Sequence, residues 1–258
     1  MLNSNVPPSI LGVIPARYAS TRFPGKPLAT LAGKPLIQHV WEQAARSRYL
    51  SRLVVATDDD RIAAAARAFG AQVAMTRSDH ASGTDRAAEV AESINADVIV
   101  NIQGDEPLID PDAIDAAILT MLDDTQCQMA SLKRRITDAT EISNPNVVKV
   151  VTAGNGDALY FSRSPIPFQR GEAAGYFKHI GLYIYRRHLL LAYSSLPVGP
   201  LERAEKLEQL RALENGIPIR VAETSYDTIG VDTPEDLAAV EKIFASSTSL
   251  VQPPKNDG

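Results

Sequence analysis

Three positively charged side chains near the start of the chain could bind phosphate. Arg17, Arg22 and Lys26 lie within ten residues and are separated by small residues and prolines. The apolar run before them ends at Pro15, so the pattern predicts a strand followed by a cationic loop. Loops at the carboxyl ends of strands in open α/β sheets offer N–H groups and positive charge to anions. Solvated surface arginines are the alternative, but the spacing favours a polyphosphate site.

The same loop excludes two common nucleotide-binding motifs. It has neither a Walker A pattern nor a GxGxxG pattern, because its glycines lack the required partners. A plain NTPase and a dinucleotide oxidoreductase are therefore disfavoured.

Two aspartates distant in the chain are candidate magnesium ligands. Asp105 follows the apolar strand predicted over 97–103, and Asp232 lies in a loop before a C-terminal helix. Carboxylates that follow separate strands of a doubly wound sheet can meet at one edge, where they could bind a phosphate-bound magnesium ion. The alternative for Asp105 is a turn aspartate. We predict that Asp105 and Asp232 are metal ligands, and that Lys26 and Arg22 balance phosphate charge during phosphoryl transfer.

Other residues of ligand type are interpreted as structural. The aspartates at 58–60 open an alanine-rich helix, where capping and the helix dipole favour acidic residues without a metal. His39 has no second ligand at metal spacing, and His80 lies in a polar loop; both are expected at the surface. Thr233 and Asp236 are expected to cap the C-terminal helix, and Asp110 is expected to cap a helix that runs to about Asp123.

The order of the elements predicts an α/β fold. Near-continuous apolar strands, such as the one predicted over 52–57, alternate with helices, which is typical of a mostly parallel sheet covered on both faces. A further short strand is expected over 219–223. From Gln128 the pattern changes to β segments separated by turns, without intervening helices, which predicts a smaller antiparallel β insertion. A single amphipathic helix is expected over 201–213. The predicted divisions are an N-terminal extension (1–9), a single domain (10–245) with the insertion at about 127–195, and a disordered tail (246–258).

Composition narrows the class further. The chain has 258 residues, 45% of them hydrophobic, which is enough for a buried core. A formal net charge of −5 gives no general attraction to nucleic acid or anionic lipid, so an anion site must be built locally. Cys127 is the only cysteine, which fits a reducing compartment. No apolar run reaches transmembrane length and the start does not resemble a signal peptide, so a cytoplasmic enzyme is expected, with no membrane or nucleic-acid partner.

Several motifs, in order, resemble one family. The segment IPARYASTRFPGKPL is similar to the signature of the sugar-activating cytidylyltransferases, and most of all to the 3-deoxy-manno-octulosonate cytidylyltransferases. The later segments SGT, QGDEP, KHIGLYIY and PLERAEKLEQLR match that family in the same order, between about Ile10 and Phe244. The resemblance implies a Rossmann-like three-layer nucleotidyltransferase fold, CTP and an acidic eight-carbon sugar as substrates, Mg²⁺ as cofactor, and a homodimer that serves lipopolysaccharide biosynthesis.

The resemblance also implies roles for particular residues. The nucleotide would contact the loop and the two later motifs: Arg17, Ser20, Arg22, Lys26, Ser82, Gly83, Thr84 and Gln103. Apart from the resemblance, Arg77 and Arg86 flank the helix start at 82–84, and Arg77 is a further candidate for the nucleotide. The sugar acid would contact Arg163, His179, Tyr183, Glu208 and Gln209. An arginine can pair with the sugar carboxylate, and the other side chains can read hydroxyl groups. His179 alternates with Ile180 and Leu182, so it is expected on the opposite face of its strand, toward a cleft.

Departures from the family pattern lie around the acceptor half. Lys178 stands where the family has arginine, Phe168 stands where a tryptophan is expected, and the segment 169–175 is short. A related acceptor, 8-amino-KDO or neuraminate, therefore remains an alternative to 3-deoxy-D-manno-octulosonate (KDO), as does a hexose-phosphate nucleotidyltransferase. A nucleotide-binding regulator without turnover is a third possibility.

Overall fold

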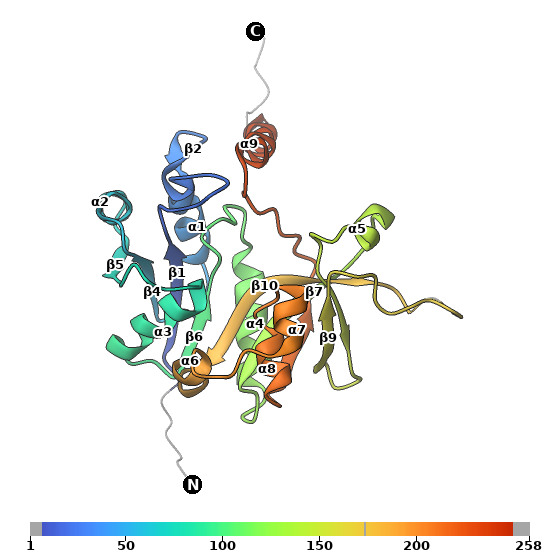
Figure 1. Cartoon of the computed structure of the whole chain (residues 1–258). Coiled ribbons are helices and arrows are strands. Elements are labelled where there is room, and N and C mark those ends of the chain that lie inside the picture. The colour runs from blue at the N-terminus through green and yellow to red at the C-terminus, as the bar shows by residue number, and fades with distance from the viewer. Residues whose placement is uncertain (1–6, 173, 250–258) are drawn as a thin grey trace.

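A nine-stranded mixed sheet forms the centre of the protein in the computed structural model, which describes residues 7–172 and 174–249 (Figure 1). Seven strands follow each other across the sheet in this order: β11 (Ile219–Glu223), β7 (Met129–Arg135), β10 (Phe177–Arg186), β6 (Val98–Asn101), β1 (Ile10–Ala16), β4 (Arg52–Thr57) and β5 (Gln72–Met75). The remaining two, β8 (Lys149–Thr152) and β9 (Ala158–Ser162), pair beside β10. A separate short pair, β2 (Thr30–Leu31) and β3 (Lys34–Pro35), follows the first loop.

Strand direction divides the sheet into two parts. Strands β6, β1, β4 and β5 are parallel, so their carboxyl ends meet at one edge. Strand β10 runs antiparallel between β6 and β7, and β11 returns parallel to β7. The predicted fold class, a mostly parallel sheet with a smaller antiparallel part, is confirmed.

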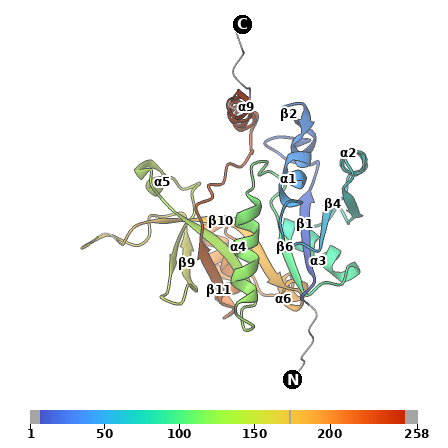
Figure 2. The ribbon, with the colours of Figure 1, turned by 180° about the vertical axis from the view of Figure 1, so that it is seen from behind.

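Helices cover both faces, as the continuous apolar strands predict. Figure 1 shows α3 (Gly83–Ser93), α6 (Arg187–Tyr193), α7 (Pro200–Glu205) and α8 (Leu210–Glu214) in front of the sheet. From behind, α1 (Leu36–Ala44) and α4 (Pro111–Leu122) cover the other face (Figure 2). The remaining helices are α2 (Asp60–Ala68), α5 (Ala139–Ser143), α9 (Pro234–Ser249) and a 3₁₀ turn, η1 (Lys26–Leu28).

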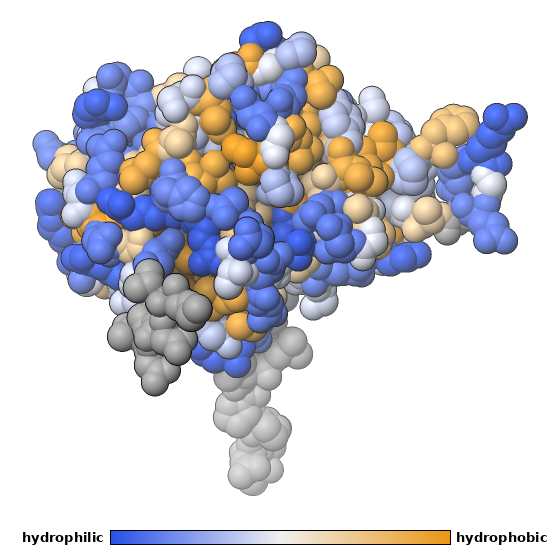
Figure 3. Space-filling model, turned by 90° about the horizontal axis from the view of Figure 1, so that it is seen from below, coloured by the Kyte–Doolittle hydropathy of each residue, from blue (hydrophilic) through white to orange (hydrophobic). Residues whose placement is uncertain are grey.

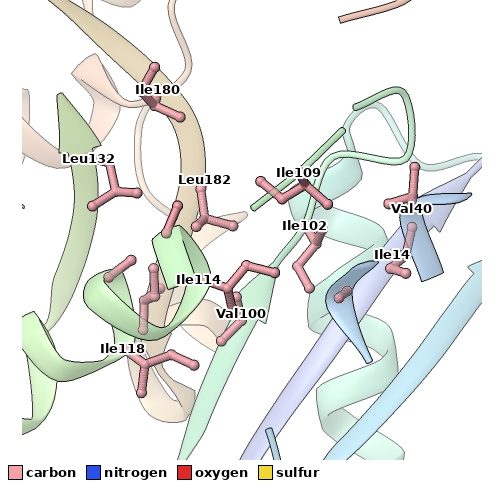
Figure 4. Close-up of a cluster of buried hydrophobic side chains, with 14 of the residues drawn as sticks. Ile14, Val40, Val100, Ile102, Ile109, Ile114, Ile118, Leu132, Ile180 and Leu182 are labelled. Carbon is pink, nitrogen blue, oxygen red and sulfur yellow. The ribbon is translucent and has the colours of Figure 1, made fainter. Parts of the chain in front are cut away.

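Each face has its own hydrophobic core. Alternate residues of β1 point to opposite faces: Ile10 and Ile14 lie in one core, and Leu11 and Val13 lie in the other. Figure 4 shows part of the first core, where Ile14 of β1 lies beside Val40 of α1 and Ile102, and the cluster continues through α4 toward β10. Full burial of one such side chain stabilises the folded protein by about 1.5–3 kcal/mol. Burial on both faces therefore holds β1 in place, and with it the position at which the following loop begins.

Helix starts follow the predicted capping chemistry. Asp59 caps α2 by accepting hydrogen bonds from the N–H groups of Arg61 and Ile62, which confirms the capping interpretation of the aspartate triplet. Asp110 caps α4. At α9 the Thr233 N–H donates to Asp236 and the Asp236 N–H donates back to the Thr233 hydroxyl.

The β-rich region has a more mixed arrangement than its sequence pattern. β7 and β10 lie within the central sheet, and only β8 and β9 form a hairpin beside it. The expectation that no helix intervenes is wrong, because α5 lies between β7 and β8. The segments 166–172 and 174–176 project away from the sheet (Figure 1) and are seen from below as an arm on the same side (Figure 3).

Two further expectations concern the C-terminal third. The single helix over 201–213 is wrong: α7 ends where Lys206 adopts a left-handed conformation (φ 54°), and α8 begins at Leu210. Helix α9 continues through Ser249, past the predicted start of the tail at residue 246, and 250–258 lie outside the described residues. Residues 1–6 of the predicted N-terminal extension also lie outside them. Within the described ranges, no helix has the length and apolarity needed to span a membrane.

Candidate active site

The cationic loop after β1 is held in shape by its own contacts. The Gly25 N–H donates to the Tyr18 carbonyl oxygen at 2.9 Å, and Gly25 has φ 70°. A Cβ at Gly25 would also lie 3.0 Å from the Tyr18 ring, so glycine is required for both conformation and space. On the other side of that ring the Arg61 guanidinium stacks 3.4 Å from its centroid. The loop therefore presents Lys26, at the start of η1, from a fixed position.

Lys26 joins two acidic residues from distant parts of the chain. Its Nζ lies 2.7 Å from Asp105 Oδ2 and 3.2 Å from Asp232 Oδ1. An Arg22 nitrogen lies 3.1 Å from the other oxygen of Asp232. Asp105 comes here because β6 and β1 are parallel neighbours whose carboxyl ends share an edge. Asp232 comes from the connection between β11 and α9, where the Val231 N–H donates to the Asp105 carbonyl oxygen at 2.9 Å.

A cavity of about 290 Å³ opens at this point. Its lining includes both aspartates and seven of the nine residues predicted to bind nucleotide: Arg17, Ser20, Arg22, Lys26, Ser82, Gly83 and Gln103. Ser82 also caps α3 through a capping box with Asp85, so the first turn of that helix faces the cavity. Helix starts and basic side chains both attract anions, which suits the cavity to a polyphosphate.

The other two predicted nucleotide residues do not line this cavity. Arg77 is exposed and pairs with Asp79 at 3.4 Å. Thr84 is buried, and its hydroxyl accepts a 3.4 Å hydrogen bond from Asn101. Thr84 lies one residue further into α3 than Gly83, and this places its side chain against β6 instead of the opening.

The structure adds two residues that sequence reasoning did not assign to the site. Arg86 lines the cavity and is held by Asp58 at 3.1 Å and by Thr76. His80 also lines it; its side chain is only 5% exposed and bonds to Glu89, so the expected surface position is wrong. Arg86 lies two residues after the SGT motif, and this proximity is the sequence feature that could have assigned it to the site.

The expectation for His39 is also wrong. It is buried, and its Nε2 lies 2.7 Å from the Leu31 carbonyl oxygen. The sequence pattern places His39 on an amphipathic helix, but it gives no sign that the imidazole ring contacts the β2–β3 pair. No group of three or more His, Cys, Asp or Glu side chains with a metal-binding arrangement occurs in the part of the chain that the structure describes.

A buried carboxyl lies directly behind the aspartate pair. Glu106 accepts a hydrogen bond from the Tyr226 hydroxyl at 3.2 Å. Burial raises the pKa of the Glu106 carboxyl to about 7. Its side chain thus faces the protein interior, while that of Asp105 faces the cavity.

Part of the predicted acceptor set forms an aromatic cluster on β10. The ring of His179 lies 5.4 Å from that of Tyr183 and 4.9 Å from that of Phe161, and its Nε2 lies 2.7 Å from the Ser131 hydroxyl. Burial lowers the His179 pKa to about 3, so the ring is neutral at physiological pH. Ile180 and Leu182 are buried in the opposite core, so His179 lies on the other face of its strand, as predicted. Its ring packs against Phe161 of the second core and is not part of the lining of the 290 Å³ cavity, so the expected cleft position stays a prediction.

The remaining acceptor candidates come from the segment between α7 and α8 and from the residue that follows β9. Glu208 is partly buried, its Oε1 has no hydrogen-bond partner, and burial raises the pKa of its carboxyl. Gln209 is buried beside it. Arg163 donates to the carbonyl oxygens of Glu205 and Pro145, so its guanidinium is engaged with backbone here.

One side chain connects the cavity to the acceptor strand. Gln103 lines the cavity, and its Nε2 donates to the carbonyl oxygen of Gly181 at 3.1 Å. Gly181 lies on β10 between His179 and Tyr183. Gln103 therefore links the cavity beside the cationic loop to the strand that carries the aromatic cluster.

Comparison with known proteins agrees with this geometry. The cytidylyltransferase family model matches residues 11–224. The chain is 62% identical over 244 residues to the 3-deoxy-manno-octulosonate cytidylyltransferase of Solibacter usitatus (strain Ellin6076), covering 94% of this chain and 97% of that protein. This chain belongs to the 3-deoxy-manno-octulosonate cytidylyltransferase family. A second member, from Geobacter sulfurreducens, is 56% identical and covers 90% of this chain and 98% of its own.

Solved structures share this architecture. The structure of a CMP:2-keto-3-deoxy-manno-octonic acid synthetase complexed with CTP has a TM-score of 0.90 and 48% identity, covering 93% of this chain and 99% of that one. A 4-diphosphocytidyl-2C-methyl-D-erythritol synthase from Anaerococcus prevotii has a TM-score of 0.62 with 11% identity, a likeness of fold alone.

Proposed function

We propose that this protein transfers CMP from CTP to KDO and releases pyrophosphate. The product, CMP-KDO, would serve bacterial lipopolysaccharide biosynthesis. The single observation that carries this proposal is the convergence of Lys26, Asp105 and Asp232 at the cavity, with the N-terminus of α3 beside it. In the reaction a hydroxyl of the sugar acid attacks the α-phosphate of CTP in line, the P–O bond to the β-phosphate breaks, and pyrophosphate leaves.

The roles of the chain's own groups follow from their charge and position. Arg17, Arg22 and Lys26 lie on a loop held by the Tyr18 contacts, so they would orient the triphosphate and offset the charge that develops on it. The ammonium of Lys26 would move from the carboxylates toward phosphate oxygens when nucleotide enters. Phosphoryl transfer depends mostly on such positioning and charge stabilisation.

The donor set fits a magnesium ion. Oxygens of Asp105 and Asp232 both approach one ammonium, so the same two carboxylates can face one cation. Magnesium needs few protein ligands when phosphate oxygens and water complete its coordination. When bound, it would neutralise phosphate charge and lower the pKa of the attacking hydroxyl.

The acceptor would bind along β10. Gln103 lies between the nucleotide cavity and the strand that carries His179 and Tyr183, so it would meet both substrates. The Oε1 of Glu208 is buried without a hydrogen-bond partner, so it would accept a hydrogen bond from a sugar hydroxyl only once the segment between α7 and α8 opens to admit the acceptor. Arg163 would bind the sugar carboxylate after it exchanges its backbone partners, and Gln209 would support Glu208. A homodimer is part of the same proposal, and light scattering of the purified protein would test it.

Pyrophosphate release is the direct test. The wild-type protein with CTP, KDO and magnesium should release pyrophosphate, and Asp105→Asn should lower the rate by about 100-fold or more at low magnesium. Asp112→Asn, an exposed aspartate on α4, is the matched control and should leave the rate unchanged. Near-normal turnover of Asp105→Asn at low magnesium would contradict the metal role.

An acceptor panel separates the alternatives. KDO should be preferred over 8-amino-KDO, neuraminate and hexose phosphates in kcat/KM, and His179→Ala should raise the KM for KDO with little change in that for CTP. Preference for another acid would reassign the acceptor. Binding of CTP by calorimetry with no turnover for any acceptor would instead indicate a regulatory module.

A further inference from the structure

The connection between β11 and α9 places Asp232 without any regular structure of its own. Residues 224–233 contain neither helix nor strand, and in Figure 1 this connection crosses from the β11 side of the sheet to α9. It begins where the Thr224 N–H donates to the Lys133 carbonyl oxygen at 2.9 Å. Irregular segments keep one conformation only where their groups are held by neighbours. The position of Asp232 thus depends on what holds this connection.

Glu106 holds the middle of the connection. Its carboxyl accepts a hydrogen bond from the Tyr226 hydroxyl at 3.2 Å, and the Thr228 side chain lies close enough to act on it electrostatically. Glu106 is 7% exposed and Tyr226 is 8% exposed, so the bond between them lies inside the protein. Burying a carboxyl without compensation is costly, and a leucine would pack this space without that cost. The polar contacts with the connection are what the carboxyl adds.

The residue between these two contacts is held from the opposite side. Asp227 pairs with Lys178 of β10 at 2.5 Å and with Arg134 of β7. Successive side chains of an extended segment point to opposite sides, so residues 226 and 228 face Glu106 while 227 faces the strands. The connection is therefore clamped on both sides a few residues before Asp232.

We propose that Glu106 is a positioning residue: through Tyr226 and Thr228 it sets the path of the β11–α9 connection so that Asp232 faces Asp105 and Lys26. Two adjacent residues then act on the same site: Asp105 bonds to Lys26, and Glu106 orients the carboxylate of Asp232. The consequence for metal binding rests on the function proposed above, whereas the anchoring itself does not.

Hydrogen exchange of the protein without nucleotide or metal tests the anchoring directly. In Glu106→Ala, amides of 226–232 should exchange at least about tenfold faster than in the wild type. Glu106→Gln keeps an acceptor for Tyr226 and should remain close to wild type. Tyr226→Phe keeps the ring and removes only the hydroxyl, so it should show an intermediate increase and covers the case in which Glu106→Ala does not fold. Asp115→Asn, another buried carboxylate bonded to Ser47 and Arg48, is the control and should leave these amides unchanged.

The magnesium dependence of turnover tests the consequence. Glu106→Ala and Tyr226→Phe should raise the magnesium concentration for half-maximal rate at least about fivefold, with the KM for KDO little changed, and Glu106→Gln should restore the wild-type requirement. A role in stability alone would lower the melting temperature of Glu106→Ala and Asp115→Asn without this shift. Unchanged exchange in 226–232 for both Glu106→Ala and Tyr226→Phe, or an unchanged magnesium requirement in both, would overturn the proposal. If the wild type released no pyrophosphate, the proposed function would fail, and the exchange experiment would still decide the anchoring.

Discussion

Lys26 and Asp232 are 206 positions apart in the chain, yet the Lys26 ammonium lies 3.2 Å from a carboxylate oxygen of Asp232. The same ammonium lies 2.7 Å from Asp105, and the Lys26 side chain is only 15% exposed. One cation thus stabilises two acidic groups that would otherwise repel each other. This arrangement keeps both carboxylates at the cavity.

Replacing Lys26 should separate its role from general surface charge. Lys26→Gln should lower kcat/KM by about 100-fold or more, because the substitution removes a positive charge that would stabilise the phosphate during transfer. Steady-state pyrophosphate release measures this. Lys34→Gln removes an exposed lysine that pairs with Glu42 and should leave the rate within twofold. Equal effects of the two substitutions would contradict a phosphate role for Lys26.

Gly104 should resist substitution because two backbones meet there. A Cβ at this position would lie 2.6 Å from the Pro15 carbonyl oxygen, which cannot move without disturbing the end of β1. Gly104→Ala should lower the free energy of unfolding by about 1–3 kcal/mol and also lower turnover, since Asp105 follows directly. Gly154→Ala, with no atom within 4 Å of its added Cβ, is the matched control and should change stability by less than about 0.5 kcal/mol. Urea unfolding compares them, and similar losses in both would be inconsistent with a close approach at Gly104.

His179 should make the protein sensitive to acid. Burial lowers its pKa from 6.5 to about 3. The unfolded chain therefore binds a proton near pH 6.5 that the folded protein accepts only near pH 3. As a result the free energy of unfolding should decrease as pH falls through this range, by up to about 1.4 kcal/mol per pH unit.

A variant that lacks His179 isolates the contribution of this residue to the pH dependence of stability. The stability advantage of the wild type over His179→Gln should shrink as the pH is lowered from 7 to 4, measured by chemical unfolding at each pH. His188→Gln, at an exposed position, should run parallel to the wild type. A constant difference between wild type and His179→Gln at all pH values would show that His179 is not held neutral by burial.

Lys149 should be essential for the β8–β9 hairpin. It is fully buried, and its Nζ donates to the carbonyl oxygens of Asn144, Val147 and Arg163 at 2.6–2.9 Å. Lys149→Met would leave these acceptors unpaired and should lower the free energy of unfolding by about 2–4 kcal/mol. Thermal and urea unfolding would measure the loss. Lys34→Met, at an exposed site, should have little effect, and an equally mild effect at Lys149 would argue against this anchoring.

Features that depend on neighbouring residues were predicted well. The strand over 52–57 and the strand over 219–223 have the predicted ends, because a continuous apolar run between polar turns specifies a buried strand locally. The caps at Asp59 and Asp110 were also predicted from the sequence, because capping involves residues only two or three positions apart. The helix over 201–213 failed because the periodicity of its apolar residues persists across the left-handed turn at Lys206.

The sequence by itself determined the cationic loop, the acidic residues after the strands, the fold class and, through its motifs, the family. Tertiary structure alone decided which of these residues meet: that Lys26 bridges Asp105 and Asp232, that Thr84 turns inward, that Arg86 and His80 line the cavity, and that Glu106 faces Tyr226. The physical reason is that hydrophobic periodicity and capping act over a few residues. The direction of a side chain at the end of a strand is set instead by packing between segments that are distant in the chain.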